Sequence, residues 1–359
     1  MYGLARPFLF CLDAEKAHGV GLKAIETAYR LGLNPLLAAK TPDLKTRAFG
    51  IDFPNPVGLA AGYDKNAAVP LVWSALGFGF AELGTITAKA QPGNPKPRVF
   101  RLEQDDALVN RLGFNNDGAI TVARRLTSLL PSGRSHPVPL GFNIGKSKVT
   151  PLDEAENDYL ISLEQLFSFA DYLVVNVSSP NTPDLRKLQE PERLGRLLEM
   201  LQTRGRQLAA QANVTPKPLL VKIAPDLTDD EAREVARVSQ SVGIAGLIAT
   251  NTTIARPPLR TPTTEDGGLS GKPLAARACE VLRVLYRAVD GKLPLIGVGG
   301  IFSAGDAYAR IRAGASLVQI YTGLIYGGPL LPRRIVDGLS ALLAKDGFRH
   351  LHEAVGTNT

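Results

Sequence analysis

Eight short apolar runs constrain the fold of this chain more than any other feature. Each closes on polar residues or glycine, and they cover residues 56–62, 80–86, 139–145, 172–178, 219–225, 246–252, 295–300 and 317–323. Near-continuous hydrophobicity over so few residues is typical of parallel strands that are buried on both faces. Segments with helix signals separate the runs, and this alternation predicts a (β/α)8 barrel. A doubly wound open sheet is the alternative, although no GxGxxG motif follows an early strand.

Two of the expected helices have recognisable ends. Thr228 and Glu231 have the spacing of a capping box, and Gly243 is a suitable stop for the helix that they begin. A second helix is expected to begin at Ser303 and to stop at Gly314.

Two insertions and an arm complete the expected organisation. Residues 87–138 separate the second and third strands and contain a further helix at about 118–130. Residues 253–274 form a long, proline-rich loop after the sixth strand, which suggests a lid. Residues 1–41 are predicted to be a separate helical arm, ahead of a catalytic barrel over residues 42–359.

The arm has a helical apolar period. Leu4, Phe8 and Leu12 recur every four residues, so one apolar face is expected. Such a helix either packs on the barrel or lies on a membrane surface. Gly19 and Gly21 weaken the helix that follows, because glycine is a poor helix former.

Composition narrows the class of protein. The chain has 359 residues, of which 45% are apolar and 21% charged, as in a globular protein with ample core. No apolar run approaches the roughly 18 residues of a membrane span. Cys11 and Cys279 lie far apart, which favours a reducing compartment without disulfides. The histidines lack zinc-type spacing, so no metal site is expected. The net charge of +7 favours anionic partners, but no basic block with interleaved aromatics predicts nucleic-acid binding.

The residues at the strand ends indicate the chemistry, because the active site of such a barrel lies at these ends. The strand-end residues are Lys65, Thr85, Asn143, Asn176, Ser179, Asn181, Lys222, Asn251, Thr252, Gly299, Gly300, Tyr321 and Thr322. They include no carboxylate pair, histidine or cysteine, which argues against glycosidase, Ser-His-Asp and metal-hydrolase chemistry. Amide side chains instead suit a planar molecule with alternating N–H and C=O groups.

A phosphate-bearing cofactor is also indicated. Gly299 and Gly300 precede a helix, and Gly323 follows the last strand, where barrels of this type bind phosphate on backbone N–H groups. Lys222 on the fifth strand adds a positive charge at the same mouth. A lysine that merely extends its charge to solvent is the alternative.

Seven motifs, taken together and in order, carry a family resemblance. They are GLAAGYDKN (58–66), NRLGFNN (110–116), VNVSSPNTP (175–183), LLVKIAPD (219–226), IATNTT (248–253), GGLSGKPL (267–274) and IGVGGI (296–301). The set resembles dihydroorotate dehydrogenase from about Arg47 to Pro329. Serine rather than cysteine at Ser179, together with AEKAH at 14–18, resembles the quinone-using class 2 of that family.

The resemblance implies an activity and partners. Members oxidise dihydroorotate to orotate in pyrimidine biosynthesis with one FMN per chain, and class 2 members pass the electrons to a membrane quinone, ubiquinone or menaquinone. It further implies a monomer that attaches peripherally to anionic lipid on the cytoplasmic face of the inner membrane.

The resemblance also implies site residues. The implied FMN shell is Ala61, Gly62, Tyr63, Asp64, Lys65, Thr85, Asn143, Asn176, Lys222, Thr250, Gly271, Gly300, Tyr321 and Thr322. The implied substrate residues are Lys65, Asn110, Arg111, Leu112, Gly113, Phe114, Asn176, Asn181, Asn251 and Thr252. The implied quinone neighbours are His18, Arg101 and Tyr321.

Ser179 is the implied general base, which takes a proton from C5 of the substrate while hydride leaves C6 for flavin N5. The family suggests a relay through Thr182 and water. Strand alternation puts Ser178 and Ser179 on different sides, so only one of them is expected to reach the ring.

Two rival functions remain open on the sequence. A tRNA dihydrouridine synthase is also an FMN barrel, but it needs a cysteine near the flavin, and Cys279 falls well after the sixth strand. A catalytically silent membrane-surface scaffold has no need of Lys65, Ser179 and Lys222 at the mouth.

Overall fold

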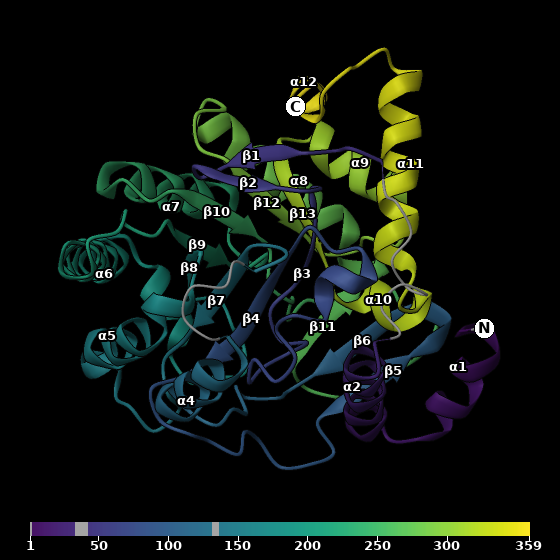
Figure 1. The fold of residues 1–359 in the computed structure, drawn as a ribbon, viewed down its shortest axis with the longest axis horizontal. Coiled ribbons are helices and arrows are strands. Elements are labelled where there is room, and N and C mark those ends of the chain that lie inside the picture. The colour runs from purple at the N-terminus through teal and green to yellow at the C-terminus, as the bar shows by residue number, and fades with distance from the viewer. Residues whose placement is uncertain (1, 33–41, 131–135) are drawn as a thin grey trace.

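Eight parallel strands close into a barrel in this structure, a computed structural model that describes residues 2–32, 42–130 and 136–359. The order around the barrel is β10-β12-β13-β3-β4-β7-β8-β9 (Figure 1). The strands are β3 (Val57–Leu59), β4 (Phe80–Ile86), β7 (Leu140–Ile144), β8 (Tyr172–Asn176), β9 (Leu219–Ile223), β10 (Gly246–Ala249), β12 (Leu295–Val298) and β13 (Ala315–Ile320). Each overlaps one of the apolar runs, so the predicted barrel is confirmed and the open sheet is excluded.

Helices cover the outside of the barrel. They are α4 (Ala119–Leu129), α5 (Ala155–Leu166), α6 (Pro191–Ala212), α7 (Asp229–Val242), α8 (Ala275–Ala288), α9 (Ala304–Arg312), α10 (Thr322–Gly327), α11 (Leu331–Lys345) and α12 (Leu351–Ala354). Short 3-10 helices are η1 (Trp73–Leu76), η2 (Glu103–Asp105), η3 (Leu152–Glu154), η4 (Phe167–Phe169), η5 (Leu185–Gln189) and η6 (Lys272–Leu274). The expected capping box of Thr228 and Glu231 begins α7, and the Ser303 hydroxyl caps α9.

A hairpin and a layer of large side chains close the N-terminal end of the barrel. The hairpin pairs β1 (Thr46–Ala48) with β2 (Ile51–Phe53). The ring of Phe53 meets Phe80 edge-on at 5.3 Å between centroids, and Tyr172 and Leu317 belong to the same buried cluster. Because this end is filled, the space for a ligand lies at the opposite end, where the strands finish.

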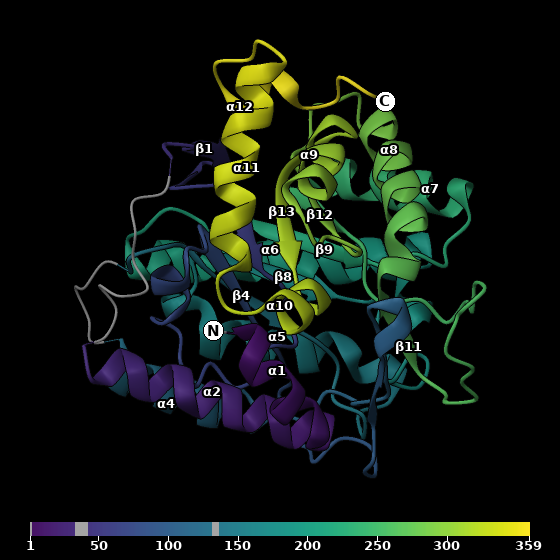
Figure 2. The same ribbon diagram turned by 90° about the vertical axis from the view of Figure 1, so that its right-hand side faces the viewer.

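The two insertions meet in a small antiparallel sheet beside the mouth. Its order is β11-β6-β5, with β5 (Val99–Leu102) and β6 (Ala107–Asn110) from the first insertion and β11 (Gly268–Gly271) from the second. Gly268 pairs with Asn110, and Gly271 with Ala107. The end of the expected lid loop is therefore held in a sheet at the rim of the barrel (Figure 2).

The N-terminal arm consists of two helices, α1 (Tyr2–Cys11) and α2 (Ala14–Arg30). The Asp13 carboxylate caps α2 by accepting from the backbone N–H groups of Glu15 and Lys16. Helix α2 runs unbroken through Gly19 and Gly21, so the expected weakness does not interrupt it. The cap and packing against the barrel outweigh the low helix propensity of glycine. The last part of the predicted arm, residues 33–41, lies outside the described residues.

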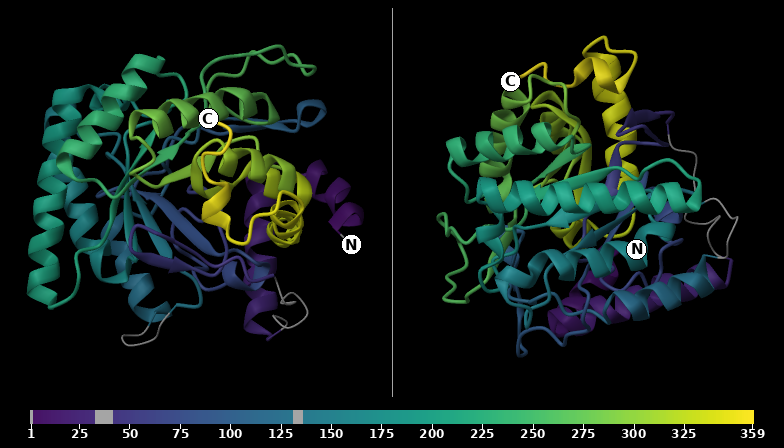
Figure 3. Two further views of the ribbon diagram at one scale, coloured as in Figure 1. Left: turned by 90° about the horizontal axis from the view of Figure 1, so that it is seen from above. Right: turned by 90° about the vertical axis from the view of Figure 1, so that its left-hand side faces the viewer.

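The arm lies against the mouth side of the molecule. Helices α5 and α6 flank the barrel on the side away from the arm (Figures 1 and 3). In the described part of the chain, no helix combines the length and apolar character that crossing a bilayer requires.

Candidate active site

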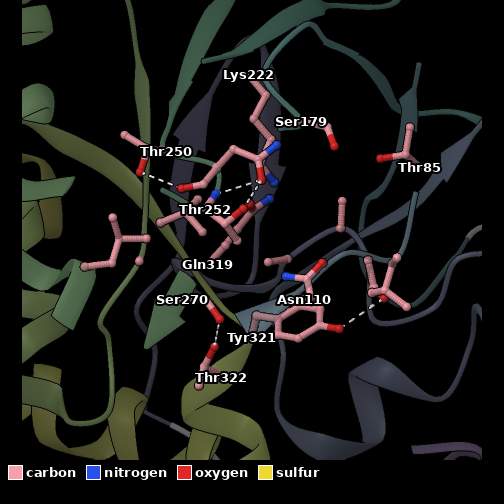
Figure 4. Close-up of a pocket in the computed structure, with 18 of the residues that line it drawn as sticks. Thr85, Asn110, Ser179, Lys222, Thr250, Thr252, Ser270, Gln319, Tyr321 and Thr322 are labelled. Atoms are coloured by element: carbon pink, nitrogen blue, oxygen red, sulfur yellow. Dashed lines mark hydrogen bonds between the residues drawn. The ribbon is translucent and has the colours of Figure 1, made fainter. Parts of the chain in front are cut away.

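A cavity of about 990 Å³ lies at the C-terminal ends of the barrel strands (Figure 4). It draws on most of the strand ends that the sequence singled out. Its polar lining residues are Lys65, Thr85, Asn110, Asn176, Ser179, Asn181, Lys222, Thr250, Asn251, Thr252, Ser270, Gln319, Tyr321 and Thr322. Ala61, Gly62, Leu112, Gly113, Phe114, Gly271, Gly299 and Gly300 also line it. The eight-fold alternation of strand and helix therefore brings together residues that are far apart in the sequence.

Buried amides below the cavity form one hydrogen-bonded chain. The Asn143 side-chain oxygen accepts from Thr85 Oγ1 at 2.5 Å and from Asn176 Nδ2 at 3.0 Å. The Asn176 oxygen in turn accepts from Ser178 Oγ at 2.9 Å. Asn251 Nδ2 donates to the same Ser178 hydroxyl at 3.0 Å. Because buried amides need both donor and acceptor partners, this chain fixes the orientation of every member.

A buried ion pair stands at the bottom of the cavity. Lys222 Nζ lies 3.3 Å from Glu82 Oε1, and both side chains are almost fully buried. Gln319 Nε2 donates to the other carboxylate oxygen at 2.6 Å. Sequence reasoning missed Glu82 and Gln319. The available signal was a charged residue inside the otherwise apolar run FAELGTI, since a buried carboxylate must have partners.

Glycines shape another part of the cavity wall. Gly300 has a left-handed φ of 69°, and an added Cβ there would lie 2.4 Å from the Cβ of Ala275. A Cβ on Gly323 would lie 2.2 Å from the Ile301 carbonyl oxygen. Both positions therefore require glycine, and they leave backbone rather than side chains at the surface of the cavity.

The two serines after β8 face different surroundings. Ser179 lines the cavity, and its hydroxyl accepts from the Asn181 backbone N–H at 3.3 Å. Ser178 is fully buried and its hydroxyl is held within the amide chain. Thr182 Oγ1 is buried nearby in sequence and has no hydrogen-bond partner among the described residues.

Arg186, which sequence reasoning did not single out, ties two strand ends together. Its guanidinium donates to the carbonyls of Ser178 at 3.1 Å and Thr252 at 3.4 Å, and it lies 2.9 Å from the Asp226 carboxylate. Asp226 also accepts from the Thr253 hydroxyl. The loop that carries Ser179 is thereby braced against the end of β10.

A second cavity, of about 1130 Å³, lies between the arm and the barrel. Its lining includes His18, Tyr63, Arg101 and the shared residues Lys65, Leu112 and Tyr321. The His18 ring packs edge-on against Tyr63 at 4.7 Å. Burial, followed by the charge of Lys65, lowers the pKa of His18 to about 4, so this imidazole is neutral at pH 7.

Charged and polar contacts fasten the arm over this cavity. Glu15 of α2 forms a two-pronged pair with Arg98, at 2.7 and 3.0 Å. Arg101 donates to the Phe10 and Leu12 carbonyls at 2.9 Å each, which satisfies the C-terminal end of α1. The Tyr2 hydroxyl donates to the Ile325 carbonyl.

Lys65 stands on the wall between the two cavities. Desolvation lowers the pKa of its amine to about 8, which the negative charge of Glu15 partly opposes. The amine is therefore charged in only part of the population above pH 8.

Four residues of the implied FMN and substrate sets do not line the first cavity. Tyr63 lines the second cavity, and Asn143 lies beneath the first. The Asp64 carboxylate accepts from the backbone N–H groups of residues 68 and 69, and burial raises its pKa. Arg111 points to Glu265 at 2.5 Å, so only its backbone is left for a ligand. In the described part of the chain, no group of three or more His, Cys, Asp or Glu side chains forms a candidate metal site.

Comparisons with known proteins agree with this geometry. Residues 43–343 match the model of the family described as dihydroorotate dehydrogenase. A dihydroorotate dehydrogenase (quinone) from Gloeobacter violaceus is 51% identical over 99% of this chain and 98% of its own length. A protein of the same description from Acidithiobacillus ferrooxidans is 50% identical over 99% of both chains.

Solved structures are similar over nearly the whole chain. The crystal structure of a ligand-free DHODH from Eimeria tenella superposes with a TM-score of 0.87 at 42% identity, covering 96% of this chain and 99% of that one. A complex of the DHODH from that organism with ferulenol gives a TM-score of 0.86 at 41% identity, covering 93% and 94%.

Proposed function

The chain belongs to the dihydroorotate dehydrogenase family, in its quinone-dependent class 2, and on that premise we propose which of its residues carry the reaction. The enzyme oxidises dihydroorotate to orotate, a step of pyrimidine biosynthesis, with FMN as hydride acceptor and a quinone as the final electron acceptor. The observation that best supports the roles below is the convergence of Lys65, Ser179 and Lys222 on one cavity. Neither a tRNA-modifying enzyme nor a silent scaffold accounts for the full-length similarity.

The residues present fit FMN. Gly300 and Gly323 leave backbone N–H groups accessible at one part of the wall, as a phosphate requires. The ion pair and the amides at the bottom of the barrel offer polar groups and a cation to a flavin ring. When bound, FMN supplies the hydride acceptor. Lys222, Thr85, Asn143 and Asn176 would hold its ring, while Ala61, Gly62, Thr250, Gly271, Gly300, Tyr321 and Thr322 would complete the shell.

The substrate is a flat cyclic imide that carries a carboxylate. Lys65 supplies a positive charge for that carboxylate, and the pair is a charge-assisted hydrogen bond. The amides available to read the imide edge are those of Asn110, Asn176, Asn181 and Asn251. The backbone of residues 111–114 closes over the substrate, with Gly113 at a φ of 68° allowing close approach.

Ser179 acts as the general base. Its hydroxyl oxygen takes the proton from C5 of dihydroorotate as hydride leaves C6, so the substrate loses two hydrogens and gains one double bond. A free hydroxyl is a weak base, and the proton must therefore pass on. Thr182 Oγ1, buried and without a partner among the described residues, is the proposed next acceptor through water.

The quinone enters through the second cavity. His18, Arg101 and Tyr321 surround its path, and His18 adds no charge to this space at pH 7. Leu4 and Phe8, exposed at 79% and 78%, form an apolar face on α1 that lies on the bilayer. We place this contact at the cytoplasmic face of the inner membrane, with a monomer whose residues 1–41 are the arm and residues 42–359 the catalytic barrel.

An anaerobic reduction experiment tests these assignments. Dihydroorotate should bleach the flavin absorbance of the purified protein, and a water-soluble quinone should restore it. A Ser179→Ala variant should slow only the bleaching. A protein that takes up FMN but is not bleached by dihydroorotate would contradict the proposed substrate residues.

A further inference from the structure

The Glu82 carboxylate lies inside the barrel, directly under the first cavity. It is fully buried on β4, and it accepts from side chains of three other strands. Asn143 Nδ2 of β7 donates at 2.7 Å, Gln319 Nε2 of β13 at 2.6 Å and Lys222 Nζ of β9 at 3.3 Å. The role of a group that joins four strands in this way is not explained by the reaction steps above.

Glu82 sets the direction of the amide chain. An ionised carboxylate only accepts hydrogen bonds, so each amide beside it must turn its NH₂ group toward it. Asn143 consequently presents its oxygen to Thr85 and Asn176. Asn176 then presents its own oxygen to Ser178, next to the proposed base. A single buried charge thus orders groups from the bottom of the cavity to its substrate side.

Glu82 also determines what Lys222 can do. Apart from Glu82, the structure gives the Lys222 amine no hydrogen-bond partner among the described residues. An ammonium group buried without a partner loses its proton or turns toward solvent. The layer below includes Phe80, Tyr172 and Leu220, and it is aromatic and aliphatic apart from the Tyr172 hydroxyl.

We propose that Glu82 is a positioning residue for the flavin: it holds the Lys222 ammonium charged and aimed into the cavity, and it orients the amides around it. This inference rests on the proposed function, because it takes the cavity to be the FMN site. Glu82 itself need not touch the cofactor, since its effect on the flavin potential passes through Lys222, whereas Asn143 and Gln319 are only oriented by it.

The test compares Glu82→Gln with Lys222→Met and with the double variant. Glutamine keeps the size but places an NH₂ group among three donors. We expect Glu82→Gln to weaken FMN binding about 10- to 100-fold, the effect of losing a charged hydrogen bond. Its flavin midpoint potential should fall, as in Lys222→Met, because the Lys222 ammonium is no longer held toward the ring. A tenfold loss in preference for reduced FMN corresponds to about 30 mV for a two-electron couple.

The decisive result is whether the shifts in flavin potential of the two single variants add up in the double variant. If Glu82 acts through Lys222, the potential of the double variant should match that of Lys222→Met alone. A folded, FMN-loaded Glu82→Gln protein with an unchanged or raised potential overturns the proposal, as do additive shifts. The double variant keeps the test valid if Glu82→Gln fails to fold, because it contains neither buried charge. A double variant with a lower potential than Lys222→Met then also overturns the proposal.

Two controls separate positioning from simple stability. Asp158→Asn removes another buried carboxylate, which accepts from Ser147 N–H and the Thr150 hydroxyl away from the cavity. It should lower thermal stability without shifting the potential. Glu82→Asp keeps the charge and should recover part of the lost potential. If wild-type protein takes up no FMN, the proposed function fails; if wild type is normal and only the Glu82 comparison disagrees, this inference alone fails.

Discussion

The two cavities of this protein share part of one wall but are built in different ways. The barrel cavity is formed by the ends of parallel strands, and its polar groups are fixed by a buried hydrogen-bonded chain. The arm cavity lies between the barrel and two helices, and these helices are held by a few contacts, chiefly those of Glu15 and Arg101. The strand-built cavity suits chemistry that needs fixed geometry, whereas we expect the helix-built cavity, which the two arm helices close on one side, to admit a bulky apolar molecule by a small movement of the arm.

The largest expected effect concerns the strand-built cavity alone. Ser179→Ala should lower the rate of flavin reduction by dihydroorotate by about 10²- to 10⁴-fold, the usual contribution of a positioned base. Stopped-flow absorbance under anaerobic conditions measures this step. Reoxidation by quinone should be unchanged. Ser178→Ala is the matched control and should lose far less, because Ser178 is turned into the amide chain. Equal losses in both variants would contradict the assignment of the base.

A substitution of Lys65 tests which of the two cavities depends on the wall that they share. Lys65→Met should raise the dissociation constant of orotate by about 10- to 100-fold, because the substrate carboxylate loses a charge-assisted partner. Spectral titration of the bound flavin measures this affinity. A larger effect on the quinone step than on orotate binding would place the main role of Lys65 in the arm cavity instead.

The pH dependence of orotate binding should follow the protonation of the Lys65 amine. The pKa of Lys65 is lowered to about 8, so its charged form dominates below that pH and is lost as the pH rises. Orotate affinity should therefore be constant below pH 7 and fall by about tenfold for each pH unit well above 8. Lys65→Met should not show this decrease of orotate affinity with pH. If it shows the same decrease as wild type, the titrating group is not Lys65.

A smaller effect is expected from loosening the helix-built cavity. Glu15→Gln leaves the buried Arg98 guanidinium without its charged partner on the arm. The Michaelis constant for a quinone should rise by about tenfold, while reduction by dihydroorotate stays as in wild type. Glu26→Gln is the matched control, because its pair with Arg30 lies on the exposed face of the same helix. Slower flavin reduction in Glu15→Gln would show that the two cavities are less separate than their construction suggests.

The smallest effect concerns the outer face of the arm. Leu4→Ser and Phe8→Ser should each lower partitioning onto anionic lipid vesicles by several-fold, because each removes apolar area from the bilayer contact. Cosedimentation with vesicles measures the partitioning. Turnover with a water-soluble quinone should not change. Ile120→Ser, at an exposed apolar position on α4, should leave partitioning unaltered.

The barrel was predictable from the sequence because the strands are buried on both faces, and each strand therefore appears as a nearly continuous apolar run. Glu82 was missed for the same reason, since one charged residue inside such a run does not reveal that three distant donors converge on it. The pairing of β11 with β6 joins segments about 160 residues apart, and no local pattern encodes it. The sequence also predicted a weakened helix at Gly19 and Gly21, but α2 is continuous there. Its N-terminal cap and its packing against the barrel outweigh the low helix propensity of glycine.

The site residues also divide into those that the sequence revealed and those that it did not. Ser179 was visible because polar residues follow directly on an apolar run, and Lys222 was visible because its positive charge lies close to the end of a strand. Arg186 was not, because its contacts join the ends of β8 and β10 through backbone carbonyls that any sequence provides. A charged residue near a strand end can be recognised from the sequence. A charged residue that binds backbone carbonyls, such as Arg186, cannot.

The shared wall of Lys65, Leu112 and Tyr321 has a consequence for inhibition. On the proposed assignment, a compound in the arm cavity and orotate in the barrel would share these three wall residues. If the compound changes the affinity for orotate by some factor, orotate must change the affinity for the compound by the same factor. This follows because coupling between two bound ligands is reciprocal. Inhibitors of the arm cavity should therefore be ranked at a fixed orotate concentration, since accumulated product alters their apparent potency without competing for their space.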